Sequence, residues 1–335
     1  RMSSTRTVRS EQCNGEGLRN YHMGDGVTLF LQSGEEYVGI MPVWDWRRLP
    51  GVTCRQAEEP LPILSVGRHR GATEFVGGAS DGADGLAAMH YSLDGVTARK
   101  AWFCRGNQIV CLGAGIRSAA DPVLTSINQC LARGEVTVGA GAAQPQMAAA
   151  GRAYDGWRWA HHDGLGYLAL DGGGASLRVA SQAGSWQQIN SNLPDESVSH
   201  QVFSLWVDHG VAPAGGAYAY AVLLGVDATA MAARADAPGF TVLANREDLQ
   251  AVSFGGDLLQ AAFHAPGALE WPGGPTVQVD RGCLVMLRRT EAGWRLHVSE
   301  PTQTLAALTA TVGGRSITVT LPSGGQAGAT VSLLV

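Results

Sequence analysis

The chain has 335 residues and a mass of 35.0 kDa, enough for more than one domain and for a sizeable hydrophobic core. Hydrophobic residues make up 45% and charged residues 16%, and no run approaches the roughly 18 apolar residues that span a bilayer, so we expect no membrane partner. The net charge of -5 argues against nucleic acid as a partner, and an acidic polymer would need a local cluster of positive charge or help from elsewhere.

The first residues show no apolar stretch between a basic head and a small-residue cleavage site, so no signal peptide is visible. Either a signal was removed or the sequence starts inside a longer protein. The six cysteines show no Cys-x-x-Cys spacing of a structural zinc site. Free buried thiols are the favoured interpretation, and a Cys104 to Cys111 pairing across a hairpin stays open.

Short runs rich in Val, Tyr, Phe and Trp, broken by Gly, Asp, Asn and Pro, recur along the chain and predict antiparallel strands. Helical periodicity is nearly absent, and parallel strands would need long crossover connections, so the sequence predicts an all-β fold of stacked antiparallel sheets. The Ala/Gly/Gln stretch from Ala140 to Ala150 is expected to be an exposed loop. Strands are predicted at Val27 to Gln32, Leu86 to Leu93, Val96 to Cys104, Leu165 to Leu170, Val202 to Asp208, Ala217 to Leu224 and Cys283 to Arg288.

One short helix is expected where Asp227 precedes a run of good helix formers that reaches Ala235 and ends before Pro238-Gly239. After this point the predicted strands become shorter and the chain ends in a Gly-rich tail, as in a compact terminal sandwich. We therefore predict a domain boundary near residue 239, with a large domain at residues 1–239 and a smaller one at residues 240–335.

Several segments, taken in order, resemble a known family. They are Ser10-Glu11-Gln12-Cys13-Asn14-Gly15-Glu16-Gly17 with Asn20-Tyr21 and Gly24-Asp25-Gly26, then Trp44-Asp45-Trp46-Arg47-Arg48-Leu49-Pro50-Gly51-Val52-Thr53, then Gly184-Ser185-Trp186-Gln187-Gln188-Ile189-Asn190 with Asp208-His209-Gly210 and Tyr218-Ala219-Tyr220, and finally Ser299-Glu300-Pro301-Thr302-Gln303. Together these segments resemble polysaccharide lyase family 8, which includes chondroitin, hyaluronan and xanthan lyases.

The resemblance implies a central antiparallel β-supersandwich followed by a small C-terminal β-sandwich. It also implies β-elimination on a uronate-containing polysaccharide such as chondroitin or hyaluronan, by a secreted or periplasmic enzyme. In this family an N-terminal α/α toroid carries the His, Tyr and Arg of the active site, and this sequence contains no such helical domain. We therefore expect the β half of a lyase, inactive alone, with an acidic polysaccharide and the helical domain as its partners.

β-Elimination removes a weakly acidic proton next to a carboxylate, so the developing enolate needs preorganised donors, and a base and an acid must lie within hydrogen-bond reach. By position in the family's motif, Glu11 matches the Glu that orients the active-site Arg and Tyr, and Asn14 matches an Asn that contacts substrate. A carboxylate suits that task because it accepts two parallel hydrogen bonds from a guanidinium. The alternative from the residues alone is a solvated loop glutamate and an asparagine that forms a turn before Gly15. Gly17 stands where the family often has Asn, which puts the local geometry in question.

Trp44, Trp46, Arg47 and Arg48 form the one cluster that is both aromatic and basic, as a sugar-binding lip would be. The alternative is that Trp44 and Trp46 face the core from a strand while the two arginines lie at the surface. We carry the four residues forward as candidate substrate-binding residues.

No cofactor is expected. The pairs His161-His162-Asp163 and Asp208-His209 offer ligand types that metals use, but their spacing specifies no site, and structural histidines explain them better. Calcium binds in the sandwich of some family members, and Asp45 offers it an oxygen, yet the neighbouring Arg47 opposes a cation. The competing function is a non-catalytic carbohydrate-binding or structural β module, which would bind sugar through Trp44 or Trp46 and be indifferent to a Glu11→Gln change.

Overall fold

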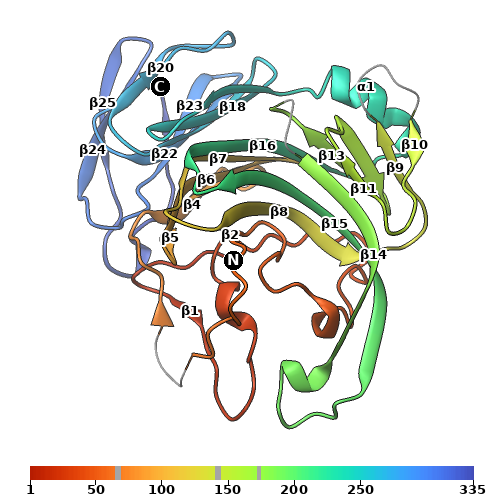
Figure 1. The fold of residues 1–335 in the computed structure, drawn as a ribbon. Coiled ribbons are helices and arrows are strands. Elements are labelled where there is room, and N and C mark those ends of the chain that lie inside the picture. The colour runs from red at the N-terminus through yellow and green to blue at the C-terminus, as the bar shows by residue number, and fades with distance from the viewer. Residues whose placement is uncertain (65–68, 140–144, 172–174) are drawn as a thin grey trace.

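The computed structural model describes residues 1–64, 69–139, 145–171 and 175–335. These residues form antiparallel sheets stacked in layers, with the chain's N-terminal stretch lying under one face and the C-terminal strands at the opposite end of the stack (Figure 1). The predicted all-β fold is confirmed.

Two sheets make up the large domain. The nine-stranded sheet runs in the order β10 (Gln146–Met147), β9 (Val136–Gly139), β12 (Trp159–His162), β13 (Leu165–Ala169), β16 (Ala214–Leu224), β7 (Gln108–Arg117), β6 (Val96–Arg105), β5 (Gly85–Leu93) and β4 (Val76–Ser80). The five-stranded sheet runs β11 (Ala153–Asp155), β14 (Ala175–Ser185), β15 (Ser197–Val211), β8 (Pro122–Leu131) and β2 (Thr53–Arg55). A separate pair joins β1 (Val8–Ser10) to β3 (His69–Arg70).

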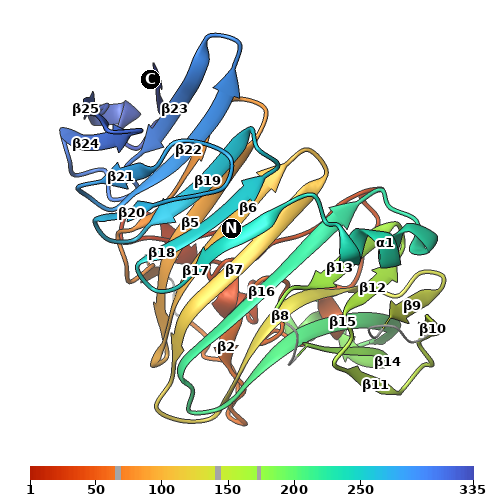
Figure 2. The same cartoon turned by 90° about the horizontal axis from the view of Figure 1, so that it is seen from above.

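Two further sheets follow residue 240, and Figure 2 shows the first of them lying across β5, β6 and β7. The six-stranded sheet runs β17 (Thr241–Asn245), β18 (Leu249–Phe254), β19 (Leu258–Phe263), β22 (Cys283–Thr290), β23 (Gly293–Ser299) and β26 (Val331–Leu334). The four-stranded sheet runs β20 (Gly267–Leu269), β21 (Val277–Val279), β24 (Ala307–Val312) and β25 (Arg315–Thr320).

The two-residue period of a strand explains how one sheet serves two cores. On β6, Trp102 belongs to the core between the nine- and five-stranded sheets, and Phe103 belongs to the core against the six-stranded sheet. On β15, Phe203 points into the first of these cores, and Val202 points into a small core on the other face of the five-stranded sheet. The sheets therefore form successive layers with an apolar core between each pair.

The few helical segments are short. The predicted helix appears as η4 (Ala228–Ala230) continued by α1 (Met231–Asp236), although the Asp227 side chain makes no capping hydrogen bond. The turn after α1 leads into β17, and the predicted boundary near residue 239 lies in that turn. The other segments are the 3-10 turns η1 (Asn20–His22), η2 (Met41–Val43), η3 (Trp186–Gln188) and η5 (Gly324–Gln326).

Most predicted strands are present, but the one expected at Val27 to Gln32 is wrong. That stretch belongs to no described sheet, and its N–H groups bond to loop groups and side chains: Thr28 donates to the Pro50 carbonyl, Phe30 to the Tyr37 hydroxyl and Gln32 to the Glu36 carboxylate. Its alternation reflects packing of Phe30 onto the core, with no neighbouring strand. The loop expected at Ala140 to Ala150 lies outside the described residues up to 144, and its remainder contains β10, so it is not wholly a loop.

Candidate functional site

The N-terminal stretch covers the outer face of the five-stranded sheet (Figure 1). A small core containing Ile40, Trp44, Leu49 and Val52 attaches this stretch to Val202 of β15. The segment from Ser10 to His22 then meets the end of the long β14–β15 hairpin, where the Leu18 N–H donates to the Ile189 carbonyl at 3.0 Å. The stretches that the sequence singled out for function thus share one surface.

Glu11 lies in an exposed position between two buried neighbours, Ser10 and Gln12. Its backbone carbonyl accepts a hydrogen bond from the Asn20 side-chain amide at 2.5 Å, while the Gln12 side-chain amide donates to the Asn20 Oδ1 at 3.3 Å. The backbone at Glu11 is therefore fixed while its carboxylate is left free, since no ion pair links it to any residue that the structure describes. This carboxylate is available to a group outside the described residues.

Asn14 turns the chain sharply, with a positive φ of 52° that Asn tolerates better than most residues. Its carbonyl accepts a hydrogen bond from the Asn192 amide at 2.8 Å, and the Gly15 carbonyl accepts one from the Ser191 N–H at 2.8 Å. Both donors belong to the connection between β14 and β15. The hairpin end therefore holds the loop in place while the exposed Asn14 side chain faces outward.

Gly17, the departure from the family pattern, has a structural counterpart. It adopts a φ of 67°, and a Cβ there would lie 2.7 Å from the Asn20 Nδ2 and 2.8 Å from the Glu11 carbonyl oxygen. The space that a side chain would fill is used by the Asn20 amide, which makes the bond to Glu11. A different asparagine thus fixes this loop.

Asp25 fastens the two ends of the loop that carries Glu11. Its Oδ2 lies 2.9 Å from His22 Nδ1 and 3.9 Å from Arg9 Nη1, and all three side chains are buried. The Arg9 guanidinium also lies over the Tyr21 ring, 4.4 Å from its centre. Burial, with the Asp94 carboxylate that accepts a hydrogen bond from the Tyr21 hydroxyl at 2.7 Å, raises the pKa of Tyr21 to about 12. Tyr21 is therefore a neutral phenol held in the fold.

Beside this loop lies an open pocket of about 390 Å³. It contains three of the four candidate substrate-binding residues, Trp44, Trp46 and Arg47, together with Arg19 and Gln188, which the sequence reasoning missed. Gln188 was part of a segment already noted for its resemblance, so that segment was a usable signal. Asp45, Glu58 and Glu59 line the pocket as well, so its two guanidinium groups face three carboxylates and it offers an acidic polymer little net attraction.

The two tryptophans do not lie on a strand, since Trp44 directly follows η2 and Trp46 lies in a turn. Trp44 is buried, its indole N–H donates to the Gln129 carbonyl at 3.0 Å, and it packs edge-on against Trp46 with ring centres 5.4 Å apart. Trp44 therefore lines the pocket with little exposed surface. Trp46 is half-buried and remains the ring of the pair that a sugar can reach.

The two arginines have different surroundings. Arg48 is bound within the fold: its Nε lies 3.3 Å from the Asp45 carboxylate and 3.1 Å from the Gln56 side-chain Oε1, and its guanidinium lies over the Trp206 ring. The Arg47 guanidinium donates to the Glu59 backbone carbonyl at 2.8 Å and lines the pocket. Arg47 is the better placed of the two to meet a ligand.

Asp45 is a poor calcium ligand in this geometry. Its Oδ1 accepts the Arg47 N–H at 3.0 Å, its Oδ2 faces the Arg48 guanidinium, and the described residues gather no group of three potential metal ligands around it or elsewhere. The candidate histidines have partners in the fold. His161 bonds to the Val226 carbonyl, His162 accepts the Arg133 N–H, and His209 bonds to the Thr125 hydroxyl.

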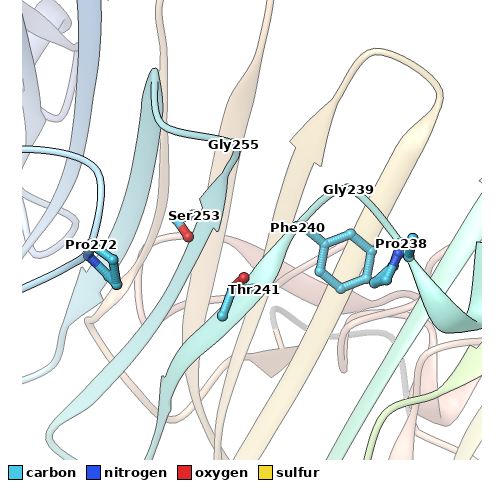
Figure 3. Close-up of a pocket in the computed structure, with 8 residues that line it drawn as sticks. Pro238, Gly239, Phe240, Thr241, Ser253, Gly255 and Pro272 are labelled. Atoms are coloured by element: carbon cyan, nitrogen blue, oxygen red, sulfur yellow. The ribbon is translucent and has the colours of Figure 1, made fainter.

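Another pocket, of about 430 Å³, lies where α1 leads into β17 (Figure 3). Phe240 and the prolines Pro238 and Pro272 form much of its wall, and the hydroxyls of Thr241 and Ser253 are its polar side-chain groups. No titratable side chain lines it, so we assign it no chemistry.

The described helices also include none long and apolar enough to cross a membrane.

Comparison with known proteins identifies the family. The chain matches the super-sandwich domain of polysaccharide lyase family 8 over residues 1–235 and the family's C-terminal beta-sandwich domain over residues 241–309. The chain belongs to polysaccharide lyase family 8. The resemblance drawn from its sequence segments is confirmed.

Relatives in the family carry several names. Chondroitinase-AC of Pedobacter heparinus is 36% identical over 305 residues, covering 90% of this chain and 43% of that protein. Hyaluronate lyase of Thermasporomyces composti is 32% identical, covering 90% of this chain and 40% of the relative. A solved chondroitinase AC lyase, studied in oligosaccharide complexes, superposes with a TM-score of 0.93 at 34% identity, over 99% of this chain and 50% of its own. The chain thus spans about half or less of the family 8 proteins it matches.

Proposed function

We propose that this chain is the β half of a lyase that cleaves a uronate-containing polysaccharide by β-elimination. Its relatives are polysaccharide lyases of family 8, which supports the reaction class. In this proposal the proton-transferring His and Tyr come from a helical toroid outside the described residues, and the β half supplies groups that orient them. The acidic polymer is its substrate, and we place the enzyme in the periplasm or medium, where such large polymers are met.

The observation that carries the proposal is the free carboxylate of Glu11 on a fixed backbone. A carboxylate held in this way can orient a guanidinium through two parallel hydrogen bonds, which fixes the plane of the arginine. Because the reaction depends on donors preorganised around the developing enolate, a change in that orientation would be felt in the rate. Asn14 lies three residues away on the same loop and would contact the substrate.

The surface beside the loop also supports a protein partner. Met41 on η2 and Trp186 on η3 are exposed apolar side chains, and η2 and η3 lie against each other next to the pocket. Exposed apolar groups gathered at one place favour an interface. We propose that the helical domain covers this surface and forms the substrate groove with it, and that this half of the enzyme uses no metal.

The test joins the chain to its helical domain and follows the unsaturated product by ultraviolet absorbance on chondroitin, hyaluronan and xanthan. We expect turnover by the joined protein and none by the chain alone. Glu11→Gln should lower kcat/KM about 10²-fold, because a small misplacement of catalytic groups costs that much. Glu16→Gln, an exposed glutamate in the same loop, is the matched control and should leave kcat/KM within about twofold.

Two results would overturn the proposal. One is the absence of unsaturated product from the joined protein on all three polymers. The other is equal activity of the Glu11→Gln and Glu16→Gln variants. Binding of a polymer without turnover, lost in Trp46→Ala and unchanged in Glu11→Gln, would favour the non-catalytic binding module instead.

A further inference from the structure

Lys100, the chain's only lysine, lies inside the protein in the middle of β6. Its side chain is fully buried, and its Nζ donates to two backbone carbonyls, those of Asp25 at 3.1 Å and Gly51 at 2.5 Å. Both carbonyls belong to loops of the N-terminal stretch, far from Lys100 in the sequence. A buried cation that bonds to loop backbone needs an explanation beyond packing.

Burial of this ammonium is unfavourable. Desolvation lowers the pKa of Lys100 to about 8, although the Asp25 carboxylate acts in the opposite direction. The faces of Tyr91 and Trp102, 5.7 and 5.6 Å from the amine, offset part of the lost hydration. An apolar residue of similar length would fill the same space without a charge to desolvate. What the lysine gains for the protein must therefore lie in the groups that it holds.

The two loops meet at the amine with very little free space. Gly26 has a φ of 95°, and a Cβ at this position would lie 2.7 Å from the Lys100 Nζ. Gly51 has a φ of 82°, and its Cβ would lie 2.4 Å from the Gly26 carbonyl oxygen. The Thr28 N–H donates to the Pro50 carbonyl at 2.8 Å, so the loops also bond to each other.

Each of these loops leads directly to one part of the candidate site. Asp25 holds Arg9 and His22, the residues that flank the Glu11 to Asn14 loop. Gly51 follows the Trp46 to Arg48 stretch, and its N–H donates to the Ser126 carbonyl on β8. One amine therefore stands at the base of both parts of the site.

We propose that Lys100 is a positioning residue. By binding both the Asp25 and the Gly51 carbonyl, it fixes the position of the Glu11 to Asn14 loop relative to the Trp46 to Arg47 wall of the pocket. It has no exposed surface and contacts no substrate. Its effect on catalysis rests on the proposed lyase function, whereas its effect on the two loops does not.

The first test measures hydrogen exchange in the lyase carrying its helical domain, with Lys100→Met compared with the unchanged protein. We expect at least tenfold less protection at the Gly26, Thr28 and Gly51 amides, and unchanged protection in the β14–β15 ladder. Arg105→Met is the matched control, because Arg105 lies on the same strand but bonds to Phe254 and Asp257 in the C-terminal domain. Equal protection in both variants at the three amides, or a uniform loss over the whole domain, would refute the proposal.

A second variant approaches the same contact from the loop and keeps the proposal testable if Lys100→Met does not fold. Gly26→Ala adds a methyl group against the amine and should expose the same three amides. Gly95→Ala is its control, since Gly95 also has a positive φ but has nothing within 4 Å of its Cβ position. Equal behaviour of the two glycine variants at the Gly51 amide, which lies in the other loop, would count against the amine as the link.

Activity provides the last readout. Lys100→Met should lower kcat about tenfold and raise KM about threefold, because it displaces both the Glu11 loop and the pocket wall, whereas Arg105→Met should change neither parameter at a temperature where both variants stay folded. Unchanged kinetic parameters in Lys100→Met would remove its positioning role. If the unchanged protein shows no turnover, the proposed lyase function fails, and the exchange measurement still decides the role of Lys100.

Discussion

The junction between the two β domains and the surface that carries Glu11 differ in whether their charged side chains have ionic partners. At the junction, Arg288 of β22 binds both Asp81 and Asp84 of the β4–β5 connection, and Arg105 binds the Asp257 carboxylate through two nitrogens. At the Glu11 surface the backbone is held by amides while the carboxylate stays exposed and without an ionic partner among the described residues. The charged groups of the junction are thus paired within the chain, whereas the Glu11 carboxylate is exposed.

This difference separates residues that stabilise the fold from residues that are exposed for function. Changes at the junction should act on stability, because they leave buried charges unpaired. Changes at the Glu11 surface should act on function with little cost in stability, because the groups there are exposed.

Arg288→Met should destabilise the chain by about 3 kcal/mol, because it leaves Asp81 and Asp84 buried without their guanidinium partner. Their side chains are 6% and 10% exposed. Burial raises the pKa of Asp81, but backbone N–H groups of Asp84 and Ala83 together with Arg288 outweigh it and hold the pKa below its usual value. Urea unfolding at pH 7 measures the change.

The control for this prediction is Arg246→Met. Arg246 pairs with Asp248, but both side chains are 54% exposed, so the same substitution should cost less than about 0.5 kcal/mol. A loss below 1 kcal/mol in Arg288→Met would mean that the junction is no more tightly matched than the open surface.

The junction should also be sensitive to acid. His90 of β5 and His264, which follows β19, bond through Nε2 and Nδ1 at 3.1 Å, and His264 Nε2 bonds to the Gln250 side-chain Oε1. Burial and then the Arg99 charge lower the pKa of His90 to about 3, and burial, His90 and Arg99 lower the pKa of His264 well below 6.5. Both imidazoles are therefore neutral in the folded chain at pH 5, where the unfolded chain binds a proton at each.

The sign follows from these shifts. Because the unfolded state takes up protons as the pH falls from 6.5 toward 3, stability is lost over that range, by about 1 to 2 kcal/mol per imidazole between pH 6.5 and 4.5. His264→Gln should reduce the loss of unfolding free energy between pH 6.5 and 4.5 by about 1 to 2 kcal/mol, as measured by urea unfolding at the two pH values. A slope unchanged by His264→Gln would show that the pair does not carry the acid sensitivity.

The layered fold was readable from the sequence because period-two runs such as Val96 to Cys104 have one dominant interpretation. The N-terminal stretch was not, because its hydrogen bonds go to side chains and loop carbonyls that lie close only after the chain has folded. Trp44 and Trp46 look alike in sequence, and burial alone distinguishes them.

The buried position of Lys100 could be predicted from the sequence. Val96, Ala98, Lys100 and Trp102 alternate along β6, so the predicted strand places a lysine on the same face as three apolar residues. A charge on a core face calls for a buried partner, although the identity of that partner depends on loops about 50 and 75 residues earlier in the sequence. Sequence alone could have raised the question, and the fold was needed to answer it.

The smallest expected effect concerns the loop that carries Glu11, where Gly17 and Asn20 share one space. Gly17→Asn should destabilise the chain because its Cβ would lie 2.7 Å from the Asn20 amide. Asn20→Ala frees that space, so the double variant should be more stable than the sum of the single changes by about 1 kcal/mol, as measured by urea unfolding. The relief is partial, because the Glu11 carbonyl oxygen lies 2.8 Å from the same Cβ position.

A matched cycle uses Gly95→Asn with Asn20→Ala. Gly95 has a positive φ of 75° and open space around it, so its effect should add to that of Asn20→Ala within about 0.3 kcal/mol. If the Gly17 pair were equally additive, the Asn20 amide would not be what fixes the backbone under the Glu11 carboxylate. The coupling should stay well below the loss in Arg288→Met, because the contacts of Asp25 with Arg9 and His22 hold the two ends of the loop, and only its tip responds.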